Sequence, residues 1–349
     1  MTAEETPEPH KRRVRYKGKN PRRFEDKYKE LNPERYADTV AHVLAGGKTP
    51  AGQHVPIMVS EIMQALSVQP SERVVDCTLG YGGHAAELLK AVQPDGCLLG
   101  VDQDPIELPK TEMRLRSAGY PAESLQCERT NFVALRSVLG KIGWYDGADA
   151  ILADLGVSSM QIDNPARGFS FKHQGPLDMR MNPNKGVSAS ALIKKLNELE
   201  LANLLSENAD EPNAELLASA LVNQKFETTG ELARAIAQAL PKSFNEDRIK
   251  LSQRLVFQAL RIEVNDELKV LDGWLRGLPN CLRSGGRVAV LTFHSGEDRR
   301  VKKAFQLGLA DELYSAISES VIRASSSEKY DNPRASSAKL RWAVRAPSS

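Results

Sequence analysis

The feature that most constrains the fold is a glycine turn between two apolar runs, the segment DCTLGYGGH at residues 76–84. The apolar pair Val74–Val75 precedes it, an amphipathic stretch covers residues 85–92, and a second apolar run, LLGVD, covers residues 98–102. This order predicts a strand, a tight turn, a helix and a second strand. Such a βαβ unit is typical of nucleotide-binding sheets.

An acid at the end of the second strand completes this pattern. Asp102 follows the glycines by about 20 residues, the separation at which such an acid accepts hydrogen bonds from ribose hydroxyls. Gly80, Gly82 and Gly83 have no Cβ, so the backbone there can approach a ligand closely. We therefore predict that these three glycines and Asp102 bind a nucleoside cofactor.

The charge around the turn favours S-adenosylmethionine over a pyrophosphate cofactor. Asp76 enters the turn, and no Arg or Lys lies between Asp76 and Glu87. A carboxylate at this position repels phosphate and suits a cationic ligand such as a sulfonium. Two alternatives stay open on these residues alone. One is an NAD-dependent oxidoreductase, which the same βαβ unit also fits, and the other is a tight turn that binds nothing.

Composition is that of an ordinary globular protein. The 349 residues carry a formal net charge of +2 and are 41% hydrophobic, which suits one large domain with an insertion or two domains. The four cysteines show no metal-ligand spacing, so we expect no metal site. No apolar run reaches the ~20 residues that span a membrane. The N-terminus lacks a signal-peptide core, so we expect a cytoplasmic protein.

Changes in composition divide the chain into regions. Residues 1–50 are rich in Lys and Arg and predict an N-terminal arm that holds RNA phosphates, or else a solubilising tail. Residues 51–162 and 250–349 alternate strand and helix patterns, as a parallel sheet requires. Residues 163–249 begin with a Gly-, Pro- and Asn-rich segment and continue as amphipathic helices, which predicts an inserted all-helical domain.

Seven apolar residues of this insert recur at helical spacing and predict its small core. They are Leu192, Leu196, Leu199, Leu204, Leu232, Ile236 and Leu240. Beyond the insert, residues 266–282 predict one amphipathic helix, and the glycine pair at residues 285–286 predicts a turn into the next strand.

Four motifs are expected to meet at the carboxyl ends of the strands, where doubly wound sheets bind ligands. They are the glycine turn, Asp102, the segment DLGVSS at residues 154–159 and the segment FHS at residues 293–295. A carboxylate after the fourth strand can accept hydrogen bonds from an amino group that is being methylated. We therefore predict Asp154 and His294 as catalytic residues. The alternatives are a structural cap for Asp154 and a hydrogen-bonded interior histidine for His294.

Ordered motifs along most of the chain are similar to those of one family. The chain resembles the bacterial ribosomal RNA small-subunit methyltransferase H (MraW-like) family. The matching segments are HVPIM at 54–58, DCTLGYGGH at 76–84, DQDP at 102–105, DLGVSS at 154–159, RGFSF at 167–171, GPLDMRM at 175–181, FQALRI at 257–262, VN at 264–265, FHS at 293–295, EDR at 297–299, NPR at 332–334 and AKLR at 338–341.

The resemblance implies a class I S-adenosylmethionine-dependent methyltransferase, a Rossmann-like α/β sheet with an inserted all-helical domain. It implies methyl transfer to the 4-amino group of a decoding-centre cytidine in 16S rRNA, with the small ribosomal subunit as partner. The cofactor residues that it implies are Gly82, Gly83, His84, Asp102, Phe132, Asp154 and Gln161. We add the hypothesis that a target-base pocket contains Arg167, Phe169, Asp178, Arg180 and Arg254. The sequence predicts no oligomeric state.

Departures from the family's usual pattern lie in the RNA-facing half. Residues 207–215 and 250–253 differ from it, and the basic segment before residue 50 is additional. A paralogue that methylates another RNA cytidine, and a non-catalytic ribosome-assembly factor on the same fold, therefore stay open as alternatives. DNA cytosine methylation is disfavoured because no Pro-Pro-Tyr or Pro-Pro-Trp follows the fourth predicted strand.

Overall fold

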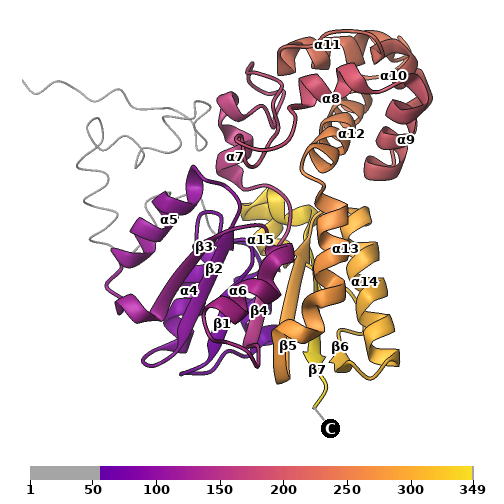
Figure 1. Ribbon diagram of the computed structural model, residues 1–349. Helices are drawn as coiled ribbons and strands as arrows, with labels where there is room; N and C mark the ends of the chain where they lie inside the picture. The colour runs from indigo at the N-terminus through magenta and orange to yellow at the C-terminus, as the bar shows by residue number, and fades with distance from the viewer. Residues whose placement is uncertain (1–55, 348–349) are drawn as a thin grey trace, which may run out of the picture. The chain divides into compact units, whose positions relative to one another are not determined.

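A single mixed sheet forms the frame of the protein (Figure 1). The computed structural model describes residues 56–347, and within them seven strands lie in the order β3-β2-β1-β4-β5-β7-β6. Their bounds are β1 (Arg73–Asp76), β2 (Cys97–Asp102), β3 (Leu125–Arg129), β4 (Ala148–Asp154), β5 (Leu282–Thr292), β6 (Tyr314–Ile317) and β7 (Lys339–Arg345). Strands β1 to β5 are parallel, whereas β7 is antiparallel to both β5 and β6. The predicted α/β sheet is confirmed.

Helices cover both faces of this sheet, so its central strands are buried on both sides. The helices beside the sheet are α3 (Val59–Leu66), α4 (Gly83–Val92), α5 (Glu107–Arg116), α6 (Leu135–Lys141), α13 (Glu267–Gly277), α14 (Ser295–Ala310) and α15 (Ser326–Asp331). Successive residues of a strand point to opposite faces. Val74 accordingly packs with α3, α4 and α5, and Val75 packs with α6, α13 and α14. The continuous apolar runs follow from this double burial.

The segment between β4 and β5 folds around a core of its own (Figure 1). After α7 (Ser159–Asp163) come α8 (Ala189–Lys195), α9 (Glu198–Ala209), α10 (Ala214–Leu221), α11 (Thr229–Ala239) and α12 (Glu246–Val264). Their buried residues form one cluster that extends from Phe169 to Leu260. The predicted domain boundary between residues 249 and 250 falls inside α12.

Most of the predicted core residues of this insert are buried, but Leu199 is not. Leu204, Leu232, Ile236 and Leu240 lie in the cluster, and Leu192 and Leu196 pack against it. Leu199 is 70% exposed. The helical register changes between α8 and α9, because Asn197 caps α9 by accepting a hydrogen bond from the backbone N–H of Glu200. The single helical spacing assumed across this point was therefore wrong.

Two further predictions near β5 are corrected by the structure. The helix predicted over residues 266–282 ends earlier, because α13 stops at Gly277 and a 3₁₀ turn covers Leu278–Cys281. The glycine pair does not precede the strand but lies inside β5, where the pairing with β4 shifts between Ala148 and Ala150. A Cβ on Gly286 would lie 2.9 Å from the carbonyl oxygen of Ala148, so this irregularity requires glycine.

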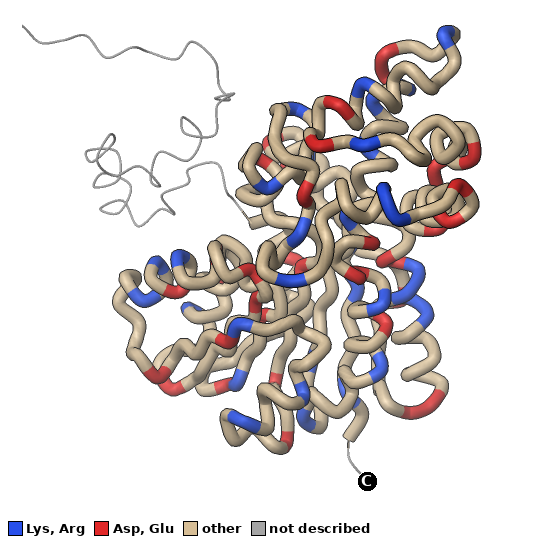
Figure 2. The backbone as a smooth tube through the Cα atoms, turned by 45° about the horizontal axis from the view of Figure 1, so that its top comes forward, with Lys and Arg blue, Asp and Glu red and all other residues tan. Residues whose placement is uncertain are grey.

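Charged residues of both signs occur along both the sheet region and the insert (Figure 2). Within the part of the chain that the structure describes, no helix is both long and apolar enough to cross a membrane. The basic N-terminal arm predicted at residues 1–50 lies outside the described residues.

Candidate functional site

The strand order brings the predicted motifs to one edge of the sheet. Strands β2, β1, β4 and β5 are consecutive neighbours and parallel. Their carboxyl ends lead into Asp102, the glycine turn, Asp154 and His294. The chain reverses its direction of winding between β1 and β4, which is where ligands bind in sheets of this kind.

The glycine turn after β1 needs two of its glycines for packing. Gly82 has a φ of 81°, and a Cβ there would lie 2.8 Å from the Cγ2 of Thr111 on α5. A Cβ on Gly83 would lie 3.0 Å from Pro56. Gly80 is different, because a Cβ there would lie in ordinary contact, 3.6 Å from the carbonyl oxygen of Thr78 and 3.9 Å from the Cβ of Ser158. Packing therefore does not require glycine at position 80, although its φ of 48° favours one.

Asp102 is tied to the turn by hydrogen bonds. Its Oδ2 accepts the backbone N–H of Gly80 at 2.8 Å, and its Oδ1 accepts the backbone N–H of Asp104 at 2.9 Å. Burial raises the pKa of Asp102 to about 6, against the backbone hydrogen bonds that lower it. A carboxylate oxygen has two lone pairs, so each oxygen can still accept a ligand hydroxyl.

Two further charged groups flank the turn. Burial raises the pKa of Asp76 to about 6, although the nearby His84 opposes this. The turn itself contains no Lys or Arg, but α5 brings Arg114 to it from outside the motif. Arg114 donates to the carbonyl oxygen of Tyr81 at 2.5 Å and lies over the Tyr81 ring at 3.6 Å. The position of Arg114 beside the turn depends on α5 packing there, which no local pattern reports.

Asp154 is the acid whose surroundings are most unusual. Its Oδ2 lies 3.4 Å from the Nδ1 of His84, which is itself buried. Its Oδ1 is buried and has no hydrogen-bond partner. Burial raises the pKa of Asp154 to about 7, and the charge of Glu297 adds to this effect. An unpaired buried oxygen is costly unless a bound ligand donates to it.

The structure gives His294 a role at the start of α14. Its side chain accepts the backbone N–H of Glu297, and the Glu297 carboxylate accepts the backbone N–H of His294 in return. The His294 Nε2 lies 3.3 Å from the Glu297 Oε1. Burial acts to raise the pKa of Glu297, but His294, the charge of Arg261 and the backbone N–H of Phe293 together lower this pKa by more. The His294 Nε2 is nevertheless buried without a hydrogen-bond partner, like the Oδ1 of Asp154. His294 therefore caps α14 and keeps one ring nitrogen unpaired, and its catalytic role stays a prediction.

The remaining predicted cofactor residues lie near the end of β2 and β3. Phe132 begins a 3₁₀ turn (Phe132–Ala134) and meets the edge of Trp274 at a centroid distance of 5.5 Å. Gln161 on α7 is buried, and its Nε2 donates to the Oδ2 of Asp104 at 2.8 Å. Gln161 thus contacts the strand end that carries Asp102 rather than pointing to solvent.

The predicted target-base residues fall into three different environments. Arg167 and Phe169 are buried, Arg167 against Asp104 and Phe169 in the core of the insert. Asp178 and Arg180 form a half-buried bidentate pair, with bonds of 2.8 and 2.7 Å. Arg254 is exposed on α12. Of the three arginines, Arg167 is buried, Arg180 is partly exposed and Arg254 is exposed.

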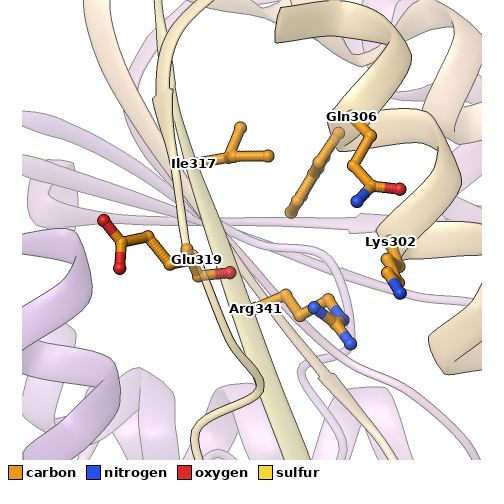
Figure 3. A pocket seen from close by; sticks show the side chains of 7 residues that line it. Lys302, Gln306, Ile317, Glu319 and Arg341 are labelled. Carbon is orange, nitrogen blue, oxygen red and sulfur yellow. The ribbon is translucent and has the colours of Figure 1, made fainter.

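A small hollow elsewhere on the molecule contains none of these residues (Figure 3). It lies between α14 and the β6–β7 edge and is lined by Lys302, Phe305, Gln306, Ile317, Ser318, Glu319 and Arg341. Arg341 is already paired with Asp298 at 2.7 Å. Among residues 56–347, no group of three or more His, Cys, Asp or Glu side chains is arranged to hold a metal ion.

The comparison with protein families identifies this arrangement. The model of the MraW methylase family matches residues 51–346, which include every strand and every predicted site residue. The chain belongs to the MraW methylase family. The class I methyltransferase fold predicted from the sequence is thereby confirmed, as is the resemblance on which part of that prediction was based.

Curated relatives agree with the family model. The chain is 48% identical to ribosomal RNA small subunit methyltransferase H 1 of Lachnoclostridium phytofermentans, covering 97% of this chain and 93% of that protein. It is 49% identical to the protein of the same name from Agathobacter rectalis, covering 97% and 98%. These matches must include most of the segment before residue 50. The family model, in contrast, begins at residue 51, and the methyltransferase H of Crocosphaera subtropica matches only 85% of this chain. The segment is therefore additional to the family model but shared with the first two relatives.

The residues of the site fit the predicted cofactor, S-adenosylmethionine. A methylase needs a methyl donor, and the glycine turn with Asp102 bound to it through Gly80 suits the nucleoside part. Asp76 and Asp154 add acidic groups that favour a cationic ligand, and the buried Oδ1 of Asp154 lacks a donor.

Proposed function

We propose that this protein transfers a methyl group from S-adenosylmethionine to the exocyclic 4-amino group of a cytidine in small-subunit (16S) rRNA, near the decoding centre. The substrate class follows the names of the curated relatives, which are small-subunit rRNA methyltransferases. The amino group as the acceptor follows from the chemistry of the site. We also propose that the protein acts in the cytoplasm on RNA within the small ribosomal subunit.

The observation that carries the choice of an amino acceptor is the unpaired oxygen of Asp154. An exocyclic amino group has two N–H donors, and its lone pair is conjugated with the ring. A carboxylate that accepts one N–H draws off the positive charge that develops on nitrogen during attack on the methyl group. A carbon or hydroxyl acceptor would supply one such donor at most.

Asp154 would also accept the proton that the amino group loses. S-adenosylmethionine supplies the methyl group when bound. In the transfer the bond between the methyl carbon and the sulfonium sulfur would break, leaving S-adenosylhomocysteine, and the amino nitrogen would bond to the methyl carbon. The nitrogen must then lose one N–H proton to become neutral again. Asp154, with a pKa raised to about 7 by burial, is matched to accept that proton near neutral pH. Asp76 and Asp102, at the ends of β1 and β2, would hold the donor.

The target base must leave its stack to reach this edge of the sheet. Arg180 and Arg254 are the described candidates for holding the RNA around it. We propose that the basic residues before residue 50 bind phosphates and add affinity that falls with rising salt. RNA binding that is independent of salt, or unchanged after removal of residues 1–50, would contradict that part of the proposal.

The test is methyl transfer from labelled S-adenosylmethionine to three acceptors: small ribosomal subunits that lack the modification, naked 16S rRNA and DNA. The modified nucleoside is identified by mass spectrometry, and Asp102→Ala is the matched control. We expect 4-amino-methylated cytidine in subunit RNA and none with Asp102→Ala. Label on another RNA nucleoside would replace the cytidine assignment. No label on any acceptor, with cofactor still bound, would favour a non-catalytic assembly factor.

A further inference from the structure

Arg167 and Asp104 form a buried ion pair that joins the insert to the sheet. The Arg167 Nη1 lies 2.8 Å from the Asp104 Oδ2, with side-chain exposures of 8% and 1%. Arg167 ends a 3₁₀ turn (Pro165–Arg167) in the segment that leads into the insert. Asp104 lies two residues beyond Asp102, at the carboxyl end of β2. The pair therefore connects the proposed nucleoside side of the site with the proposed RNA side.

Both members of the pair use their hydrogen bonds within the protein. The Asp104 Oδ2 also accepts from Gln161 at 2.8 Å, and its Oδ1 accepts backbone N–H groups of Ile106 and Glu107. The Arg167 Nη2 donates to the carbonyl oxygens of Arg180 at 3.1 Å and Met181 at 2.8 Å. Arg167 is therefore not the substrate contact that the sequence predicted.

A buried ion pair is poor support for stability, because desolvation offsets most of its attraction. Its geometry, however, is strict. A planar guanidinium binds one carboxylate and two carbonyls only when all three occupy fixed positions. The pair thus determines where residues 180 and 181 lie relative to the end of β2.

Hydrogen bonds continue from this pair in both directions. Toward the cofactor side, the backbone N–H of Asp104 donates to Asp102, which also accepts from Gly80. Toward the RNA side, the backbone N–H of Met181 donates to the Asn265 side chain at 2.7 Å. Residues 178–181 are therefore held from two sides, by Arg167 and by Asn265.

We propose that Arg167 is a positioning residue that couples cofactor binding to the placement of residues 178–181, where Arg180 is presented to RNA. This inference rests on the proposed function of the same site. A nucleoside on Asp102 restrains Asp102 and, through it, the backbone at Asp104. The Asp104 carboxylate then holds Arg167 and the segment that it carries. Because coupling between two sites is reciprocal, RNA bound to this segment tightens cofactor binding by the same factor.

The first experiment measures hydrogen exchange of residues 178–181 in the full chain, with and without saturating S-adenosylhomocysteine. It needs no RNA, so it does not depend on the identity of the methylated nucleotide. In the wild type we expect exchange at residues 178–181 to be at least roughly 5-fold slower with the ligand bound than without it. In Arg167→Lys we expect no such slowing, because an ammonium does not bridge the carboxylate and both carbonyls.

Arg287→Lys is the matched control. Arg287 is also partly buried, binds Glu72 with two nitrogens at 2.9 and 2.7 Å, and donates to the carbonyl oxygen of Leu66. Its partners precede β1, at the opposite end of the sheet from the site. We expect Arg287→Lys to lower stability but to keep the full slowing of exchange at residues 178–181.

The second experiment measures the dissociation constant for 16S rRNA with and without S-adenosylhomocysteine. We expect the ratio of the two constants to be about 5 or more in the wild type and near 1 in Arg167→Lys. If Arg167→Lys does not fold, Asp104→Asn replaces it in the experiment. Asparagine keeps the shape of the aspartate side chain but removes its negative charge. An unchanged exchange effect in a folded Arg167→Lys or Asp104→Asn protein overturns the inference.

Different experimental results would contradict the proposed methyl transfer and the proposed coupling. S-adenosylhomocysteine that binds by calorimetry without slowing exchange in the wild type overturns the coupling and leaves methyl transfer intact. Slowed exchange that depends on Arg167, in a protein that methylates no RNA, supports the coupling and contradicts the methyl transfer.

Discussion

The Oδ2 of Asp154 lies 3.4 Å from the Nδ1 of His84, while the His84 Nε2 lies 2.9 Å from the carbonyl oxygen of Ile57. A carbonyl oxygen only accepts hydrogen bonds, so the Nε2 carries a hydrogen. The Nδ1 of His84 can donate to the Asp154 Oδ2 only when the ring carries a second proton. The Oδ1 of Asp154 is buried with no hydrogen-bond donor among the described residues, so a ligand can supply one.

Replacement of this acid should separate catalysis from stability. We expect Asp154→Asn to lower the rate of methyl transfer at least ~100-fold, because the amide accepts no proton. Single-turnover transfer to the small subunit measures this rate. A folded Asp154→Asn protein with a rate within a few fold of the wild type would remove Asp154 from the proton step.

The stability of the same variant should depend on pH. Burial raises the pKa of Asp154 to about 7 in the folded protein, above the ordinary value of 3.8. The unfolded chain therefore loses this proton first, and the stability of the wild type falls as pH rises from about 4 to about 7. We expect the melting temperature of Asp154→Asn, relative to the wild type, to increase over this range and then stay constant. A constant difference at all pH values would contradict the raised pKa.

Methyl transfer should rise with pH through about 7. Asp154 accepts a proton only when it is ionised, so the rate follows its deprotonated fraction. The groups that face it are His84 and Asp76 on one side and Glu297 on the other. The measurement is the single-turnover rate from pH 5.5 to 8.5. The residual rate of Asp154→Asn should lack this rise.

Cofactor affinity should depend on both oxygens of Asp102. We expect Asp102→Asn to weaken S-adenosylhomocysteine binding roughly 10- to 100-fold, the usual effect of losing a hydrogen bond to a charged group. The amide keeps one acceptor for either Gly80 or Asp104, so the turn should stay folded. Calorimetry measures the affinity. The matched control is Asp149→Asn, an acid at the other end of the sheet that accepts the backbone N–H of Arg73. It should leave this affinity unchanged.

Two glycines with the same φ should respond differently to alanine. Gly82 and Gly143 both have a φ of 81°. A Cβ on Gly143 meets nothing within 4 Å, whereas one on Gly82 lies 2.8 Å from Thr111. We expect Gly143→Ala to cost about 1 kcal/mol of unfolding free energy from the left-handed backbone alone. Gly82→Ala should cost clearly more and should also weaken cofactor binding. Equal losses in chemical denaturation would contradict a packing role for Gly82.

His294 offers a test between a catalytic and a structural histidine. Serine is a good residue at the first position of a helix and can accept the backbone N–H of Glu297 as His294 does. We expect His294→Ser to fold and to transfer methyl groups within a few fold of the wild type. His294→Leu, which cannot cap α14, should be less stable by about 1 kcal/mol or more. A 100-fold loss of rate in a stable His294→Ser protein would restore the catalytic assignment.

Local sequence patterns predicted those parts of the candidate site that lie within one short segment of the chain. The glycine turn and Asp102 were predictable because a strand, a turn, a helix and a second strand follow each other without interruption. Asp154 was predictable for a similar reason, since it directly follows a buried strand. In each case the side chain's place depends on the strand that carries it, and parallel strands end at one edge.

Contacts between distant segments were decided by the tertiary structure. Arg167 and Asp104 are 63 positions apart, and the sequence suggested that Arg167 faces RNA. Arg114 reaches the glycine turn only because α5 packs against it, and Phe169 is buried only because the insert folds around it. The sequence by itself determined the sheet, the glycine turn and the acids at the strand ends, because these depend on local spacing and apolar periodicity. Only the tertiary structure decided which charged side chains stay exposed and which are buried in pairs, because burial and pairing depend on segments that meet after folding.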